Sequence, residues 1–96
     1  MISASEARAN VQNYKDFLYA ETKKIVTEIL DDMDMCIQFH SENGLEEVTF
    51  HPYTTSHFPS QEEMEIAERI FSATFINFGY TIIKNSFADN ILIITW

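Results

Sequence analysis

The sequence predicts one α+β domain made of a long N-terminal helix and a small three-stranded mixed sheet with one packed helix. The chain has 96 residues, which suit one domain and are too few for two. No Gly or Pro occurs between Met1 and Asn43, so nothing interrupts a long helix. In residues 45–96, short runs rich in β-branched and aromatic residues surround one segment whose apolar residues recur with a helical period. The predicted order is therefore α-β-α-β-β, and 46% hydrophobic residues supply its core.

The first helix is predicted over residues 3–42. Ser3 and Glu6 form a capping-box pair at its start, and Asn43-Gly44 supplies its stop. Apolar residues recur in steps of three, four or seven, which places them on one face of a helix. They are Ala7, Val11, Tyr14, Leu18, Ile25, Ile29, Met33 and Cys36.

Such a helix is too long for the domain. At 1.5 Å per residue it spans about 60 Å, whereas a compact chain of this size has a radius of gyration of about 13 Å. Either the helix bends near its Asp-rich segment, or its N-terminal half projects and packs on another copy. Because no Gly or Pro marks a break, we expect projection and a homo-oligomer. The expected interface residues are Val11, Tyr14, Leu18, Ile25 and Ile29.

Residues 45–96 are expected to form a β-α-β-β unit. The run 45–51 is rich in β-branched and aromatic residues, and Pro52 ends it. Ser60 and Glu63 form a second capping box, and Gly79 ends the helix that follows. Its predicted apolar face consists of Met64, Ala67, Phe71, Phe75 and Phe78.

Two strands are predicted over 80–85 and 91–96, joined as a hairpin by turn-forming Asn, Ser and Asp residues. A right-handed β-α-β crossover would make the first two strands parallel, with the last strand antiparallel beside the second. The final strand is apolar on both faces. One helix covers only one side of a small sheet, so the other side requires the first helix or another subunit.

The charge limits the partners of the protein. Fifteen acids against six bases give a formal net charge of −9. Nucleic acid and anionic membranes need Lys and Arg to neutralise phosphate, so we expect neither as a direct partner. The negative charge is consistent with a partner protein that has a basic surface. It is also consistent with mimicry of a nucleic-acid backbone, or with a role in solubility alone.

A run of acids in the first helix is the candidate surface for a basic partner. An EF-hand is excluded there because the run contains no Gly. The alternative is a solvated helix face. The run comprises Glu28, Asp31, Asp32 and Asp34.

The segment between Pro52 and the second helix is the candidate for a small ligand. Its hydroxyls, imidazoles and aromatic rings can hydrogen-bond and stack against a nucleotide. The three Glu residues at 62, 63 and 65 disfavour an anion at the helix start that follows, and an ordinary capped connection is the alternative. The candidate residues are His51, Tyr53, Thr54, Thr55, Ser56 and His57.

The sequence contains no recognised pattern for catalysis or metal binding. Cys36, His40, His51 and His57 supply zinc-type ligands, but their spacing matches no compact zinc motif, so we expect no metal. Nothing indicates an activated Cys–His pair. Gly occurs only at 44 and 79, which excludes phosphate-loop and dinucleotide fingerprints. We therefore expect no cofactor and no enzymatic activity.

The compartment is expected to be cytoplasmic. The lone Cys36 cannot form an internal disulfide, and the first residues lack the basic start and apolar stretch of a signal peptide. No apolar run approaches the roughly 18–20 residues that cross a bilayer.

The opening residues Met1-Ile2-Ser3-Ala4-Ser5-Glu6-Ala7-Arg8 resemble the start of many small tailed-bacteriophage proteins. These proteins also tend to have a long first helix, a Gly-Tyr pair opening a strand and an Ile-Ser-Trp-like end. The counterparts here are Gly79-Tyr80 and Ile93-Ile94-Thr95-Trp96. The resemblance implies a viral origin, with a location in the host cytoplasm or the virion, and a role in host takeover, defence evasion or the particle. It transfers no functional residues.

Three functions follow as hypotheses. The first is an oligomeric, acidic, non-enzymatic inhibitor that binds a host or defence protein. The second is a protein that binds or sequesters a nucleotide signal, and the third is a structural subunit of the virion.

Overall fold

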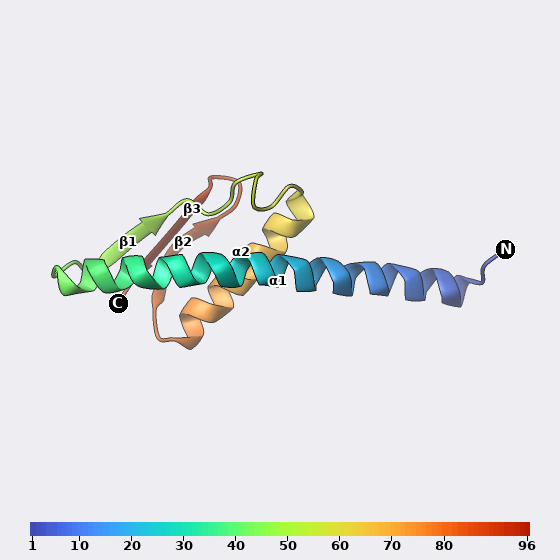
Figure 1. Cartoon of the computed structure of the whole chain (residues 1–96), viewed down its shortest axis with the longest axis horizontal. Helices are drawn as coiled ribbons and strands as arrows, with labels where there is room; N and C mark the ends of the chain where they lie inside the picture. Colours follow the sequence, from blue (N-terminus) through green and yellow to red (C-terminus); the bar gives the residue numbers. More distant parts are fainter.

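The computed structural model describes residues 1–96 and has two helices and three strands (Figure 1). The α+β class and the order α-β-α-β-β are confirmed. The elements are α1 (Ala4–Glu42), β1 (Glu47–Phe50), α2 (Gln61–Asn77), β2 (Thr81–Ser86) and β3 (Ile91–Thr95).

Helix α1 runs for 39 residues between the signals that the sequence shows. The Ser3 hydroxyl oxygen accepts a hydrogen bond from the Glu6 N–H at 3.1 Å. At the other end the chain turns at Asn43 and at Gly44, whose φ of 81° lies in the region that favours glycine. The helix runs unbroken through its Asp-rich segment, and its N-terminal end projects from the rest of the chain. Packing of this end on another copy stays a prediction.

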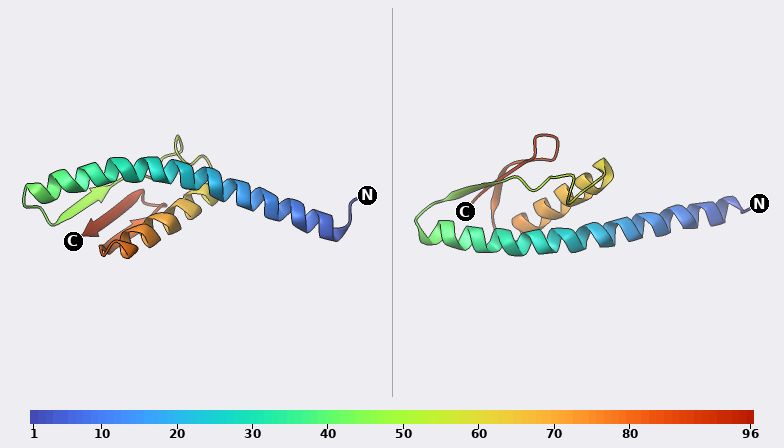
Figure 2. Two further views of the ribbon diagram at one scale, coloured as in Figure 1. Left: turned by 60° about the horizontal axis from the view of Figure 1, so that its bottom comes forward. Right: turned by 45° about the horizontal axis from the view of Figure 1, so that its top comes forward.

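The projecting part of α1 comprises residues 4–17, which we call the arm; residues 18–96 are the body. Every arm residue is exposed except the half-buried Ala7. Figure 2 shows the arm extending past the rest of the chain in both views. The molecule consequently measures 63 × 23 × 20 Å, and its radius of gyration of 16.3 Å exceeds the roughly 13 Å of a compact chain.

The sheet has the order β1-β3-β2, and β3 pairs antiparallel with both neighbours. Strands β1 and β2 therefore run in the same direction, as predicted, but the predicted mixed sheet is wrong, because β3 lies between them and they do not pair. The predicted antiparallel hairpin of β2 and β3 is confirmed. In the centre of the sheet β3 has pairing partners along both edges, and its side chains on each face lie between those of β1 and β2.

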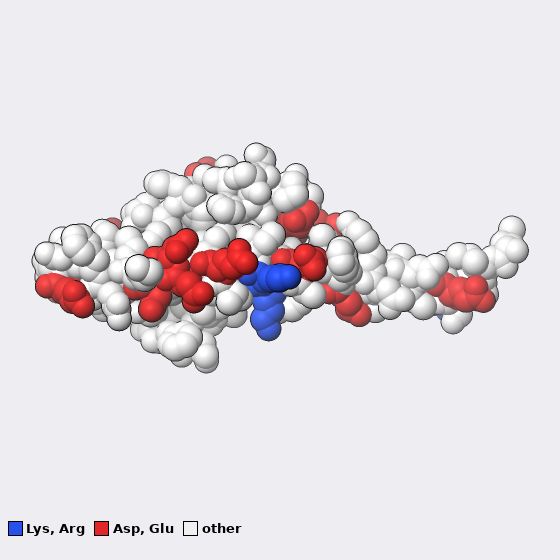
Figure 3. Space-filling model, viewed as in Figure 1, with Lys and Arg blue, Asp and Glu red and all other residues white.

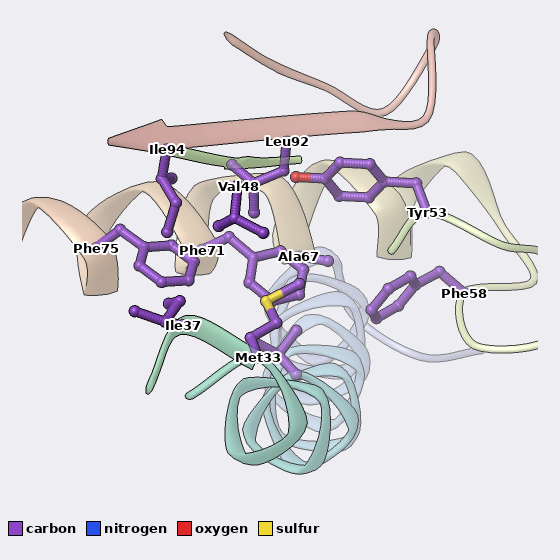
Figure 4. Close-up of a cluster of buried hydrophobic side chains, with 11 residues drawn as sticks. Met33, Ile37, Val48, Tyr53, Phe58, Ala67, Phe71, Phe75, Leu92 and Ile94 are labelled. Atoms are coloured by element: carbon purple, nitrogen blue, oxygen red, sulfur yellow. The ribbon is translucent and has the colours of Figure 1, made fainter. Parts of the chain in front are cut away.

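Both helices pack on the same face of the sheet. Figure 4 shows Leu92 and Ile94 of β3 pointing toward residues of α1 and α2. The core cluster therefore joins two helices, two strands and the segment after β1. Its members are Val26, Met33, Ile37, Val48, Tyr53, Phe58, Ala67, Phe71, Phe75, Leu92 and Ile94.

No helix covers the second face of the sheet. Ile91 and Ile93 of β3 lie there, half-buried among strand neighbours, and Ile83 is 54% exposed where β2 has a bulge. Cover by α1, one of the two expected alternatives, is wrong, since α1 shares the core with α2; cover by another subunit stays a prediction.

The buried face of α1 also differs from the predicted stripe. Leu18 and Met33 are buried as predicted, but Thr22, Val26 and Ile37 are buried as well, although they lie off the stripe. In α2, Ala67, Phe71 and Phe75 are buried as predicted. Phe78 is 75% exposed because it lies past the last turn, at the C-cap.

Candidate functional site

The predicted acidic run is a free surface on the middle of α1. Glu28, Asp31, Asp32 and Asp34 are all exposed, and Figure 3 shows acidic side chains gathered there. None of them forms a salt bridge, because the only one in the molecule joins Lys84 to Asp89 at 3.0 Å. Their carboxylates are therefore available to a partner, although basic side chains lie beside the acidic cluster (Figure 3).

A groove of about 400 Å³ separates this part of α1 from the C-terminal end of α2 and the start of β2. It combines an apolar floor with two of the four acids. Its lining residues are Thr27, Leu30, Asp31, Asp34, Ile37, Thr74, Phe75, Phe78 and Tyr80.

The groove forms because two helix faces and one turn meet. Residues 27, 30, 31, 34 and 37 are connected by steps of three or four, so they lie on one side of α1. Gly79, with φ of 89°, turns the chain from α2 into β2 and brings Tyr80 back beside Phe75. The two rings pack edge-on with centroids 5.6 Å apart, and Tyr80 packs in the same way on Trp96 at 6.2 Å. One wall is therefore a packed aromatic cluster.

The chemistry of the groove suits a basic amphipathic segment. Buried Ile37 and Phe75 offer contact to an apolar side chain, and the 75%-exposed Phe78 extends that surface at the edge. Asp31 and Asp34 then stand within reach of Lys or Arg flanking that side chain. The sequence identified these acids but not the groove beside them.

A second pocket, of about 280 Å³, lies between α1 and the predicted ligand loop. It brings Asp32 of the acidic run to the loop residues His51, Thr54 and His57. The His51 Nδ1–H donates to the Asn90 carbonyl at 2.8 Å, and the hydroxyls of Thr54 and Ser56 lie 3.0 Å apart. Other lining residues are Ile29, Met33, Phe50 and Pro52, while Thr55 and Ser56 are exposed outside it.

Tyr53 belongs to the core and not to a ligand site. Its ring is 4% exposed and packs edge-on against Phe71 at 5.9 Å. Its hydroxyl donates to the Asn85 side-chain oxygen, and the Asn85 amide donates to the Glu68 carbonyl at 3.0 Å and to Ser72 at 2.8 Å. Burial, with a smaller contribution from the nearby Glu68 charge, raises the pKa of Tyr53 well above its ordinary value.

Asn90 fixes the same loop from the hairpin. It adopts a positive φ of 49°, and its side-chain oxygen accepts from the Tyr53 N–H at 2.7 Å. The sequence predicted Asn85 and Asn90 only as turn residues. Their side-chain hydrogen bonds to Tyr53 were missed, because the residues around the hairpin give no sign that the segment after β1 packs against it.

The structure does not bring Cys36, His40, His51 and His57 together as a set of zinc ligands. No group of three or more His, Cys, Asp or Glu residues is arranged to hold a metal ion. His40 donates from Nδ1 to the Cys36 carbonyl of its own helix at 2.7 Å, and Cys36 is half-buried against the core.

The residues predicted for self-association divide between the two parts of the molecule. Val11 and Tyr14 are 54% and 56% exposed on the arm. Leu18 is buried within its own chain, and Ile25 and Ile29 pack on the core cluster. Phe17, which the stripe did not include, is 63% exposed beside them.

Comparison with protein-family models, curated proteins and solved structures finds no match for this chain. Neither helix combines the length and apolar character that crossing a bilayer requires.

Proposed function

We propose that this chain is a non-enzymatic binding protein that holds a basic segment of another protein in the groove between α1 and α2. One observation carries the proposal. Asp31 and Asp34, which form no salt bridge within their own chain, flank an apolar floor that includes Ile37 and Phe75.

The two features act at different ranges. A net charge of −9 raises the rate at which a basic partner meets this protein, and salt screens that attraction over about 8 Å at physiological ionic strength. The groove volume of about 400 Å³ lies within the range of natural ligand sites, which starts at about 300 Å³. An amphipathic helix placing an apolar side chain in such a groove is a common mode of recognition.

The resemblance to small phage proteins extends the proposal to an inhibitor of a host or defence protein. Such an inhibitor would occupy a basic surface that its target uses for another ligand. The resemblance and the charge support this extension.

A short amphipathic peptide tests the groove. The probe carries two Leu residues on one helical face flanked by Arg and Lys, and its matched control has Glu at the basic positions. Binding is measured by the fluorescence of Trp96, the single tryptophan, which packs on Tyr80 of the groove wall. We expect the basic peptide to bind and the binding to weaken as salt is raised.

Two double variants separate the groove from net charge. Asp31→Asn with Asp34→Asn is expected to weaken the basic peptide about tenfold, because each exposed ion pair contributes up to about 1 kcal/mol. Glu46→Gln with Glu47→Gln makes the same charge change outside the groove lining and is expected to have little effect. Equal losses in both variants, or binding unaffected by salt, would contradict the proposal.

The nucleotide-binding alternative rests on the pocket beside the loop. Asp32 lines that pocket and adds negative charge, while Tyr53 is committed to the core, so the geometry favours it less. A nucleotide present at 100 times its dissociation constant adds roughly 2.7 kcal/mol of stability. If a thermal-shift screen of nucleotides gives no stabilisation, this alternative loses its support.

The virion alternative rests on the arm, which offers a rod for packing against other subunits. Detection of the chain in purified particles would favour that role over inhibition.

A further inference from the structure

The arm carries an apolar face that its own chain leaves bare. Leu18 is the first buried residue of α1, and Tyr14, Val11 and Ala7 continue the same helical face from it toward the N-terminus. Val11 and Tyr14 are more than half exposed, and Phe17 beside them is 63% exposed. Three large apolar side chains within two helical turns form a patch of the kind that marks an interaction surface.

The charges of the arm and the body are unequal. The arm holds two acids, Glu6 and Asp16, and two bases, Arg8 and Lys15, so it is neutral. The body therefore carries the entire net charge of −9, and Figure 3 shows the arm with far fewer acidic side chains than the body. Two bodies repel each other, whereas two arms meet without repulsion.

We propose that the arm is the pairing site for the arm of a second copy, and that the two arms lie antiparallel. A second copy offers the same bare apolar face with balanced charge. A basic partner, by contrast, is drawn to the acidic body and gains no charge attraction from the arm.

The antiparallel arrangement follows from the charge of the bodies. Fourteen arm residues span about 21 Å, so antiparallel arms hold the two acidic bodies at opposite ends, beyond the roughly 8 Å screening length. Parallel arms would instead place the acidic runs on the two α1 helices side by side. Pairing centred midway between Val11 and Tyr14 sets Val11 opposite the partner's Tyr14, and the symmetry repeats this contact.

The size of the patch predicts a reversible dimer. A fully buried aromatic side chain covers 150–250 Å², so the exposed parts of Tyr14, Phe17 and Val11 supply roughly 300 Å² per copy. The total of roughly 600 Å² is below the 1,200 Å² typical of a stable interface. Dissociation is therefore expected within the micromolar range or above it.

Sedimentation and small-angle X-ray scattering on the full chain test this pairing. With rising concentration the mass should climb from 11.2 kDa toward twice that value. The maximum dimension should grow from about 63 Å to roughly 100 Å, because only the arms overlap. Raising the salt should leave the dimer unchanged or strengthen it, whereas binding in the groove should weaken.

Val11→Gln with Tyr14→Gln should keep the chain monomeric, and circular dichroism should show the helix retained, since neither side chain is buried. The control Phe39→Gln changes an aromatic that is 65% exposed near the other end of α1, and it should leave the dimer intact. A folded monomer at millimolar concentration, or a dimer that persists in the double variant, would overturn the pairing. A doubled mass with a maximum dimension near 63 Å would overturn the antiparallel arrangement.

Discussion

The arm and the body-bound part of α1 belong to one helix but differ in what supports them. All five buried residues of α1 lie between Leu18 and Ile37, and none lies in the arm. The body-bound part contacts α2 and β1, while the arm is exposed along its length and meets α2 only at its last residues, where Lys15 and Asp16 line a pocket with it. The difference teaches that caps and the absence of Gly and Pro set the length of a helix, whereas tertiary packing sets where it is stable.

The largest expected contrast comes from removing one Phe ring in each part. Phe71→Ala in the body removes a ring that is 0% exposed and should lower the free energy of unfolding by about 3–5 kcal/mol. Phe17→Ala in the arm should change it by less than about 0.5 kcal/mol. Urea denaturation at a concentration below self-association measures both. A comparable loss in the two variants would show that the arm is packed and would break the comparison.

Side-chain hydrogen bonds should give the next contrast. Asn85→Ala leaves the Tyr53 hydroxyl without its acceptor inside the body and should cost about 1–3 kcal/mol. Gln12→Ala removes the exposed bond from Gln12 to Asp16 in the arm, at 2.8 Å, and should cost no more than about 0.5 kcal/mol. Thermal unfolding followed by far-UV circular dichroism compares them. A neutral Asn85→Ala would mean that water replaces the bond.

The two capping boxes offer a matched pair with a smaller effect. Ser60 accepts from the Glu63 N–H at 3.2 Å and begins a helix that packs on the sheet, so Ser60→Ala should cost about 1 kcal/mol of global stability. Ser3→Ala should only fray the arm, because unfolding of the body does not depend on it. Hydrogen exchange resolves the two cases: faster exchange confined to the arm is expected for Ser3→Ala. Faster exchange throughout the body in that variant would contradict the independence of the arm.

The smallest effect is expected from the one salt bridge of the body. The hydrogen bond from Lys84, together with its charge, holds the pKa of Asp89 below its ordinary value of 3.8. A carboxyl with a lowered pKa stabilises the fold above its unfolded pKa, and that contribution disappears as the pH falls through the folded pKa. Lys84→Gln should move the Asp89 pKa, measured by NMR titration, up toward 3.8. An unchanged pKa would show that solvent screens the exposed pair completely.

Local features of the fold were predictable from the sequence. Ser3 and Ser60 cap the helices as expected, and α1 and α2 end at Asn43 and before Gly79. These signals act within one turn of chain, so the residues that carry them are neighbours in sequence.

The order of the strands was not predictable in the same way. The pattern shows that β3 is apolar on both faces, but it does not show which strand pairs with which. Insertion of β3 between β1 and β2 satisfies that pattern, and so did the mixed arrangement that we expected. Thr22 is fully buried but was not part of the predicted stripe, which stepped from Leu18 to Ile25, because that stripe was built from apolar residues alone.

The candidate site was half predictable. The acidic run on α1 stands out as a local cluster of charge. The groove beside it needs Phe75, Phe78 and Tyr80, which lie some 40 residues away in the chain, and only folding brings them to Asp31 and Asp34. The assignment of Tyr53 to a ligand failed for the same reason, because its partner Asn85 is 32 residues distant.

The central place of β3 has a consequence for synthesis on the ribosome. Strands β1 and β2 have no pairing with each other, so a nascent chain that lacks residues 91–95 has no sheet against which α1 and α2 can pack. Domains generally fold as units during translation. The emerging polypeptide would therefore expose the apolar faces of α1 and α2 until β3 leaves the exit tunnel. The net negative charge of the residues already translated would oppose association of such chains by electrostatic repulsion.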